Sequence, residues 1–250
     1  MRSSARRTRR GAGAARRGGA AALVVVALAS TACGGGTKAA EPTTTKRPTT
    51  TTLVVLDQAK LDAALLTLAD LPPGWTAEST TTTAPAGGSG NDPAEFLCPA
   101  GRTAFSADEH DAATATFTQG DAGPNLLEEV SSAEDATKHF DEVKGAFASC
   151  VGQRWTEVTD GEPTEFTLAE VSTPPTGEQS AAYRLTGTAA SMPLTIVVDF
   201  VITQQGTVVA VFGSTNVQSP MLTVNQFTPE QFAQVVATGM TKIEQQAGSA

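Results

Sequence analysis

Histidines, the side chains most often used as a catalytic base or a metal ligand, are few in this sequence. The chain holds two histidines, His110 and His139. His139 falls in a predicted amphipathic helix, and we expect it on the solvated face of that helix. His110 lies among Asp108, Glu109 and Asp111, whose oxygens could bind a cation. Their spacing matches no calcium loop, which favours a solvated acidic loop.

No catalytic pattern accompanies these residues. The sequence contains no G-x-S-x-G or S-x-x-K motif, no glycine-rich phosphate loop and no cysteine-histidine cluster with metal-site spacing. Carboxylate pairs such as Glu128 and Glu129 are common in a chain with 26 acidic residues, and without a nucleophile beside them they do not indicate catalysis. We therefore expect no enzyme, no cofactor and no metal site.

Large aromatic side chains that could contact a ligand are scarce. The chain has two tryptophans, Trp75 and Trp155, and one tyrosine, Tyr183. Isolated aromatics of this kind stand more often in a core or at its rim than against a ligand. These three are nevertheless the candidate ligand-binding residues. Trp155 follows Cys150 closely and could pack on a disulfide there.

The first 32 residues have the composition of an export signal. Seven arginines and no acid precede an apolar run at residues 20–29, which corresponds to the n-region and h-region of a signal peptide. This run is about half the roughly twenty residues that a membrane-spanning helix needs. Residues 1–32 are therefore predicted to be a cleaved signal peptide.

Cys33 directly follows Ser30, Thr31 and Ala32. The arrangement resembles the lipobox of bacterial lipoproteins, in which the cysteine becomes the acylated N-terminus, although leucine is usual where Ser30 stands. The alternative is plain secretion, because the same small residues suit a general signal peptidase. We expect palmitate or a related acyl chain on Cys33 to hold the protein on the extracytoplasmic face of the cell membrane.

Residues 33–52 are predicted to be a tether, because glycine, threonine and proline leave almost nothing for a core. Their threonines are equally compatible with an O-glycosylated stalk and with a bare spacer. Removal of the leader leaves 10 basic against 26 acidic residues, a formal charge of −16. Such a chain is a poor electrostatic partner for nucleic acid or anionic lipid surfaces.

Cys98 and Cys150 remain as an even pair if Cys33 carries lipid. In an exported protein, two such cysteines are expected to form a disulfide. The alternative is a pair of buried free thiols, whereas a metal site is disfavoured because no histidine stands nearby. The disulfide would close a loop of about fifty residues and stabilise the fold by roughly 4 kcal/mol.

The remaining residues, 53–250, show three helix signals. The first is Asp57 as an N-cap, with a leucine stripe that ends before Pro72-Pro73. The second is a capping box in which Ser131 and Ser132 precede Glu134 and Asp135, followed by an apolar stripe that ends at Cys150. The third is Thr228-Pro229 with Gln231, a capping box flanked by Phe227 and Phe232 as a hydrophobic staple, followed by a stripe to Ile243.

Strand signals fill the stretch between the second and third helices. The runs are RWTEV, EFTLAEV, AAYRLTGTA, PLTIVVDFVITQ and TVVAVFGSTN, and Gln205-Gly206 indicates a tight hairpin. The fourth run is apolar enough for a central strand covered on both faces, where Asp199 must be paired or lie at the edge. We expect an α+β domain in which about three helices pack on an antiparallel meander, with one disulfide. Residues 79–90 are expected to form a surface loop.

These elements resemble a known family. The segment SSAEDATKHFDEVKGAFASC, then RWTEV, then a meander ending in GTVVAVFGSTN and a closing helix, are similar to the extracellular sensor domain of the mycobacterial serine/threonine protein kinase H and its free-standing relatives among actinobacterial lipoproteins. The resemblance covers residues 53–246. It implies a sensor-like domain whose family has two disulfides around a cleft, whereas this chain has cysteines for one. A kinase portion is absent.

Three functional classes follow from these features. The first is a non-enzymatic, membrane-tethered domain that binds a small ligand or an envelope protein. The second is a carrier of a lipid or glycolipid, which would need a large apolar cavity. The third, a hydrolase, is disfavoured because no nucleophile and base are paired.

Overall fold

The computed structural model describes residues 54–82, 97–105, 112–120, 123–159, 162–221 and 225–248. The predicted signal peptide and tether, Cys33 and His110 all lie outside these ranges. The elements in chain order are α1 (Gln58–Ala64), η1 (Leu68–Asp70), β1 (Thr76–Thr82), α2 (Pro99–Phe105), β2 (Ala112–Thr118), β3 (Asn125–Ser132), α3 (Ala136–Ala148), β4 (Arg154–Thr159), β5 (Glu162–Glu170), β6 (Gln179–Ala189), β7 (Thr195–Gln205), β8 (Val208–Gln218) and α4 (Pro229–Gly248).

These strands form one antiparallel sheet in the order β1-β2-β3-β8-β7-β6-β5-β4. The chain makes two meanders, β1 to β3 and β4 to β8, and β8 closes the sheet by pairing with β3 at the centre. The α+β class, the meander of β4 to β8 and the hairpin at Gly206 are confirmed. The expected loop at residues 79–90 is wrong for Ser79–Thr82, which belong to β1, and its remainder lies outside the described residues.

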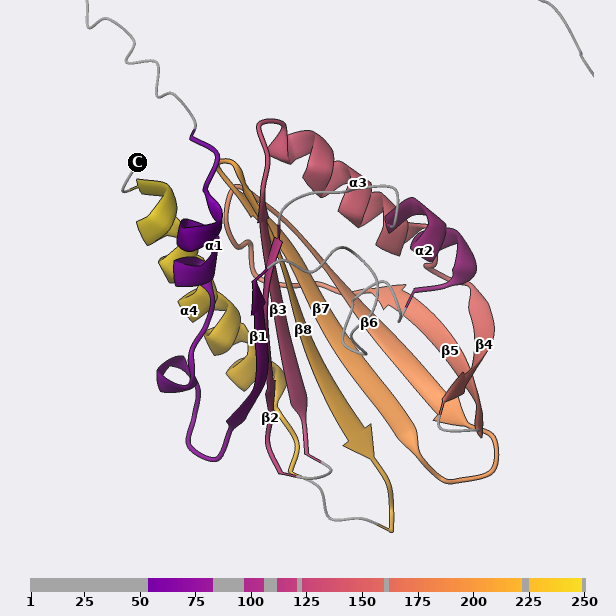
Figure 1. Ribbon diagram of the computed structural model, residues 1–250. Helices are drawn as coiled ribbons and strands as arrows, with labels where there is room; N and C mark the ends of the chain where they lie inside the picture. The colour runs from indigo at the N-terminus through magenta and orange to yellow at the C-terminus, as the bar shows by residue number, and fades with distance from the viewer. Residues whose placement is uncertain are drawn as a thin grey trace, which may run out of the picture. The chain divides into compact units, whose positions relative to one another are not determined.

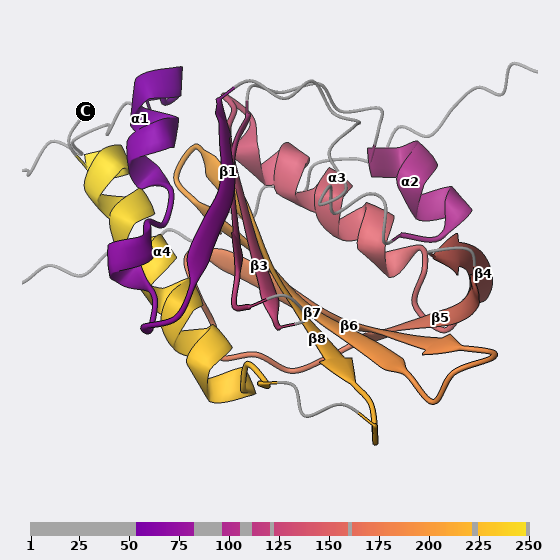
Figure 2. The same ribbon diagram turned by 60° about the horizontal axis from the view of Figure 1, so that its bottom comes forward.

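Helices cover both faces of the sheet (Figures 1 and 2). α1 and α4 pack on one face, where their apolar side chains join alternate residues of β2, β3 and β8 in one core cluster. α2 and α3 pack on the other face, against alternate residues of β5 to β8. β7 is therefore a central strand, and its Asp199 pairs with Arg184 of β6 at 2.6 Å, as one of the two expected arrangements required.

Local signals set the ends of α1 and α4. The Asp57 side chain accepts a hydrogen bond from the Lys60 amide and caps α1. At α4, the Thr228 hydroxyl accepts from the Gln231 amide, and the Gln231 side chain accepts from the Thr228 amide, which confirms the predicted capping box. Phe227 and Phe232 lie edge to face with ring centroids 6.3 Å apart.

The predicted start of α3 is wrong. Ser131 and Ser132 are the last residues of β3, and the N-cap of α3 is Asp135, whose side chain accepts from the Lys138 amide. Ser131 bonds instead to His139 and to the Val209 carbonyl of β8, and Ser132 bonds to the Thr207 carbonyl in the turn before β8. None of the described helices is long and apolar enough to cross a membrane.

Candidate functional site

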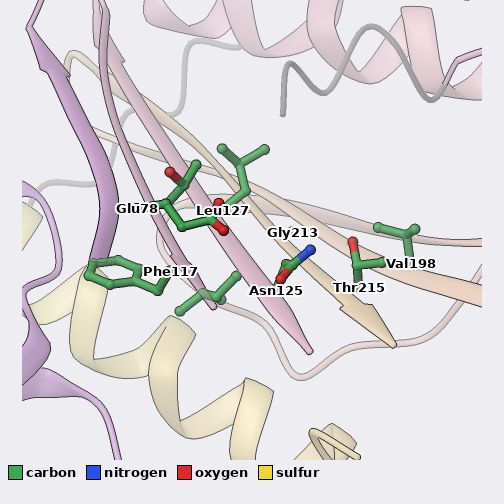
Figure 3. A pocket seen from close by; sticks show the side chains of 9 residues that line it. Glu78, Phe117, Asn125, Leu127, Val198, Gly213 and Thr215 are labelled. Carbon is green, nitrogen blue, oxygen red and sulfur yellow. The ribbon is translucent and has the colours of Figure 1, made fainter. Parts of the chain in front are cut away.

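A small hollow lies on the face of the sheet that carries α2 and α3 (Figure 3). α3 packs over the end of β3 at Ser131, whereas the hollow lies at the other end, between Leu127 of β3 and Gly213 of β8. Its volume is about 20 Å³. Figure 3 shows Glu78, Asn125 and Thr215 among the side chains around it.

Two backbone features create this hollow. Gly213 contributes no side chain, and a Cβ there would lie 3.3 Å from the Phe200 ring and 3.7 Å from the Leu127 Cβ. The pairing of β1 with β2 also shifts register between Ala77 and Ser79. Such a bulge redirects side chains, and here Glu78 lines the hollow.

The lining has the chemistry of a polar recognition site. The carboxylate of Glu78, the amide of Asn125 and the hydroxyl of Thr215 lie beside the apolar side chains of Leu127 and Val198. In the described part of the chain, no hydrogen bond or ion pair engages the Glu78 carboxylate. A volume of about 20 Å³ admits a water molecule or one small polar group and is too small for an acyl chain.

The three aromatic candidates do not lie together. Trp75 is buried in the cluster under α1 and α4, with its ring edge to face with Phe227 at 5.1 Å. Tyr183 is buried on the opposite face, stacked on Phe147 at 5.3 Å. Trp155 is half-buried and stacks on Phe166 at 6.0 Å. Their roles as ligand contacts stay predictions, and no single site contains all three.

Tyr183 has surroundings typical of a core residue. Its hydroxyl donates to the Lys144 carbonyl at 3.4 Å and so joins β6 to α3. Burial, assisted by the charge of Glu170, raises the pKa of Tyr183 to about 12. The phenol is therefore neutral at physiological pH.

The prediction for His139 is wrong. Its side chain is 8% exposed, and Nε2 lies 2.9 Å from the hydroxyl of Ser131, which also bonds to the Val209 carbonyl. This serine-histidine pair joins α3 to the sheet, and its burial gives a substrate no access. A sequence signal was present, because His139 falls at helical spacing between the buried residues Ala136 and Val143.

The predicted disulfide is confirmed. Cys98 and Cys150 are bonded with Cα atoms 5.6 Å apart, which fixes the start of α2 to the end of α3. The two helices approach closely because of Gly101, where a Cβ would lie 2.7 Å from the Cys150 Sγ and 2.8 Å from the Ala146 carbonyl oxygen. Trp155 packs against the cluster that contains this disulfide.

The fold is shared with a solved structure. The extracellular domain of PknH from Mycobacterium tuberculosis matches with a TM-score of 0.56 and 12% identity, over 78% of this chain and 100% of that chain. The chain has the fold of that extracellular domain. The resemblance inferred from the sequence is thus confirmed at the level of fold.

A second match is weaker. A putative uncharacterized protein from Mycobacterium smegmatis aligns with a TM-score of 0.42 and 10% identity, over 75% of this chain and 96% of that chain. No protein-family model matches the chain, and no curated protein matches it. Among the described residues, no group of three acidic, cysteine or histidine side chains is arranged to hold a metal ion.

Proposed function

We propose that the protein is a non-enzymatic lipoprotein of the cell envelope, with a domain that binds a small ligand or an envelope protein in the manner of a sensor. The main support is the match to an extracellular domain over that domain's full length. Further support comes from the export signal that precedes Cys33 and from a disulfide of the kind that oxidising compartments favour. The hydrogen-bonded pair of Ser131 and His139 is buried and joins α3 to the sheet.

The binding surface in this proposal is the hollow between β3 and β8. Glu78 and Asn125 supply a charged acceptor and an amide on an exposed rim. A ligand that presents an amine or a hydroxyl would therefore fit the rim, and an apolar part could lie on Leu127. The alternative of a lipid or glycolipid carrier needs a far larger apolar cavity than this hollow offers.

The anchor is tested by replacing Cys33 with serine. The variant should leave the membrane fraction and appear in the medium, and the wild-type N-terminal peptide should carry an acyl mass. The signal-peptide substitution Ser30→Leu restores the usual lipobox and serves as the matched control, because it should stay in the membrane fraction. A Cys33→Ser protein that remains in the membrane fraction would refute lipid anchoring.

Binding is tested by gentle native mass spectrometry of the processed Cys33→Ser chain from an actinobacterial host. A co-purifying small mass should disappear in the double variant Glu78→Ala, Asn125→Ala. It should persist in the control Glu165→Ala, whose carboxylate pairs with Arg154 on another part of the sheet. A co-purifying mass that organic extraction removes and that persists in the double variant would support the lipid or glycolipid carrier instead. A measured mass equal to that of the chain alone would contradict a tightly bound small ligand. Binding to an envelope protein would then be tested by cross-linking.

A further inference from the structure

Glu128 is a carboxylic acid enclosed in the core. It lies in the middle of β3 on the face that α1 and α4 cover, and its exposed fraction is 0%. One oxygen, Oε2, accepts a hydrogen bond from the Leu66 backbone amide at 2.6 Å. The other oxygen, Oε1, is buried and has no hydrogen-bond partner. A carboxylate charge in this position would lose its hydration with little in return.

Every element around Glu128 closes it off from water. β2 and β8 place Ala115 and Phe212 beside it in the sheet. α4 approaches at Gly239, where a Cβ would lie 3.1 Å from Oε1. The segment after α1 covers the carboxyl group through Leu66. Water can therefore reach Glu128 only if a covering segment moves.

Two charged groups act on Glu128. Lys242 of α4 and Asp70 of η1 form an ion pair at 2.9 Å beside it, and their effects on its charge oppose each other. On α1, Asp62 accepts from Gln58 of the same helix. The near neutrality of the Lys242–Asp70 pair leaves burial as the dominant influence on Glu128.

Residues 54–71, which we call the clasp, are the covering segment best suited to move. They contact the rest of the domain through a few polar contacts and through five buried leucines, Leu56, Leu61, Leu65, Leu66 and Leu71. Apart from Leu66, the Val54 carbonyl accepts from Thr207, the Leu56 amide donates to Ser132, and Asp70 pairs with Lys242. α1 has seven residues, too short to be stable without packing. The clasp also directly follows the predicted tether in the chain.

We propose that the clasp is a pH-controlled element, docked on the sheet while Glu128 is neutral and released when Glu128 becomes charged. This goes beyond the proposed binding function, since it places the control at the other face of the sheet from the hollow. It makes the domain responsive to envelope pH at the point where it joins the tether.

The direction and size of the response follow from linkage. Burial raises the pKa of Glu128 from 4.5 to about 8 in the docked state. In the released state water reaches the carboxyl group, and its pKa returns toward 4.5. Release therefore becomes easier as pH rises between these values, by up to tenfold per pH unit. From pH 5 to pH 7 the released fraction should rise about 70-fold.

Asp70 sets the acid limit of docking. Burial acts to raise its pKa, but the hydrogen bonds from Lys242 and Thr67 outweigh that effect and lower the pKa below 3.8. Asp70 is thus charged, and its ion pair with Lys242 is present, at pH values above this lowered pKa. The ion pair is lost as the pH falls through the pKa of Asp70. The clasp should be tightest near pH 4.5.

The test is hydrogen exchange by NMR on the processed Cys33→Ser chain. The Leu66 amide, which donates to Glu128, reports release directly. Its protection factor, corrected for the intrinsic exchange rate, should fall about 70-fold between pH 5 and pH 7. In Glu128→Gln the same factor should not change with pH. The control Glu129→Gln, on the opposite face of β3, should keep the wild-type slope.

Two results would overturn the proposal. One is a Leu66 protection factor equal to that of the β8 amides at every pH, because exchange would then require global unfolding. The other is a pH slope that persists in Glu128→Gln. If that variant does not fold, the side-chain carbon signal of Glu128 in the unsubstituted domain is the second measurement. A titration midpoint near 4.5 refutes the proposal, whereas a midpoint near 8 together with a Leu66 protection factor below that of the β8 amides supports it.

Discussion

The same substitution at two helical glycines should have opposite effects on stability. Gly145 lies in α3 on its exposed side, and a Cβ there would meet nothing within 4 Å. Gly239 lies in α4 against the sheet, and a Cβ there would come 2.6 and 2.8 Å from two carbons of the Phe212 ring. Gly145→Ala is therefore a matched control for Gly239→Ala.

The expected magnitudes come from two opposing effects. Alanine in a helix interior is more favourable than glycine by about 1 kcal/mol, and this gain applies at both positions. At Gly239 the added methyl must displace a Phe212 ring that is completely buried, and overpacking of this kind costs about 1–3 kcal/mol. We expect Gly145→Ala to stabilise the domain by about 1 kcal/mol and Gly239→Ala to destabilise it by about the same amount.

Urea unfolding followed by tryptophan fluorescence measures both effects. With an m-value of about 2 kcal/mol/M, the two midpoints should move roughly 0.5 M in opposite directions. The variant Phe212→Leu makes room and should cost less in the Gly239→Ala background than alone, as a double-mutant cycle would detect. Equal stabilisation by both alanines would refute the close packing of α4 on β8.

Three further outcomes are expected. Replacing Cys98 and Cys150 with alanine opens a loop closed across 52 residues and should cost about 4 kcal/mol in urea unfolding, so a loss below about 1 kcal/mol would contradict the entropic reasoning. Because burial keeps Glu128 protonated in the folded state, the free energy of unfolding should fall by about 1.4 kcal/mol per pH unit between pH 4.5 and about 8. Glu128→Gln should remove this pH dependence, and a slope unchanged in that variant would contradict the assignment to Glu128. Ser131→Ala removes the hydrogen bond to His139 and should cost about 1–3 kcal/mol in thermal unfolding, whereas an unchanged Tm would show that the bond contributes nothing.

The elements that were predicted correctly from sequence are those specified by residues close together in the chain. The α4 cap is a reciprocal bond between Thr228 and Gln231, three positions apart. The strands β4 to β8 are β-branched runs joined by short turns, so their pairing follows from their order. In both cases the local sequence preference and the contacts in the folded protein agree, so the sequence pattern was enough to predict the element.

The first meander gives no such signal. β1 is a run of threonines, alanine and acid that also suits a loop, and β2 is built largely of alanine and threonine. β3 carries Glu128 and Glu129 at its centre, which lowers its apparent hydrophobicity. β1 pairs with β2 and β2 with β3, and β3 joins them to the rest of the sheet by pairing with β8, whose residues lie about eighty positions later. A local pattern does not report such a contact.

Ser131 and Ser132 show how a local pattern can mislead. Serine three positions before an acid is a sound capping signal. Here both serines stand in β3, and each finds a partner far along the chain, Ser131 at Val209 and Ser132 at Thr207. Because both serine hydroxyls are engaged in these long-range hydrogen bonds, neither caps the helix. The N-cap of α3 is Asp135.

Glu128 and Glu129 are the strongest example of what the fold adds. Adjacent residues of a strand point to opposite faces, so one register decides which carboxyl group is enclosed. Leu126 and Val130 pack under α1 and α4, and Glu128 shares their face. Its closest polar partner, the Leu66 amide, is 62 positions earlier in the chain. The pair looks in sequence like ordinary surface charge, yet folding makes one member an acid whose ionisation is coupled to the docking of the segment beside the tether.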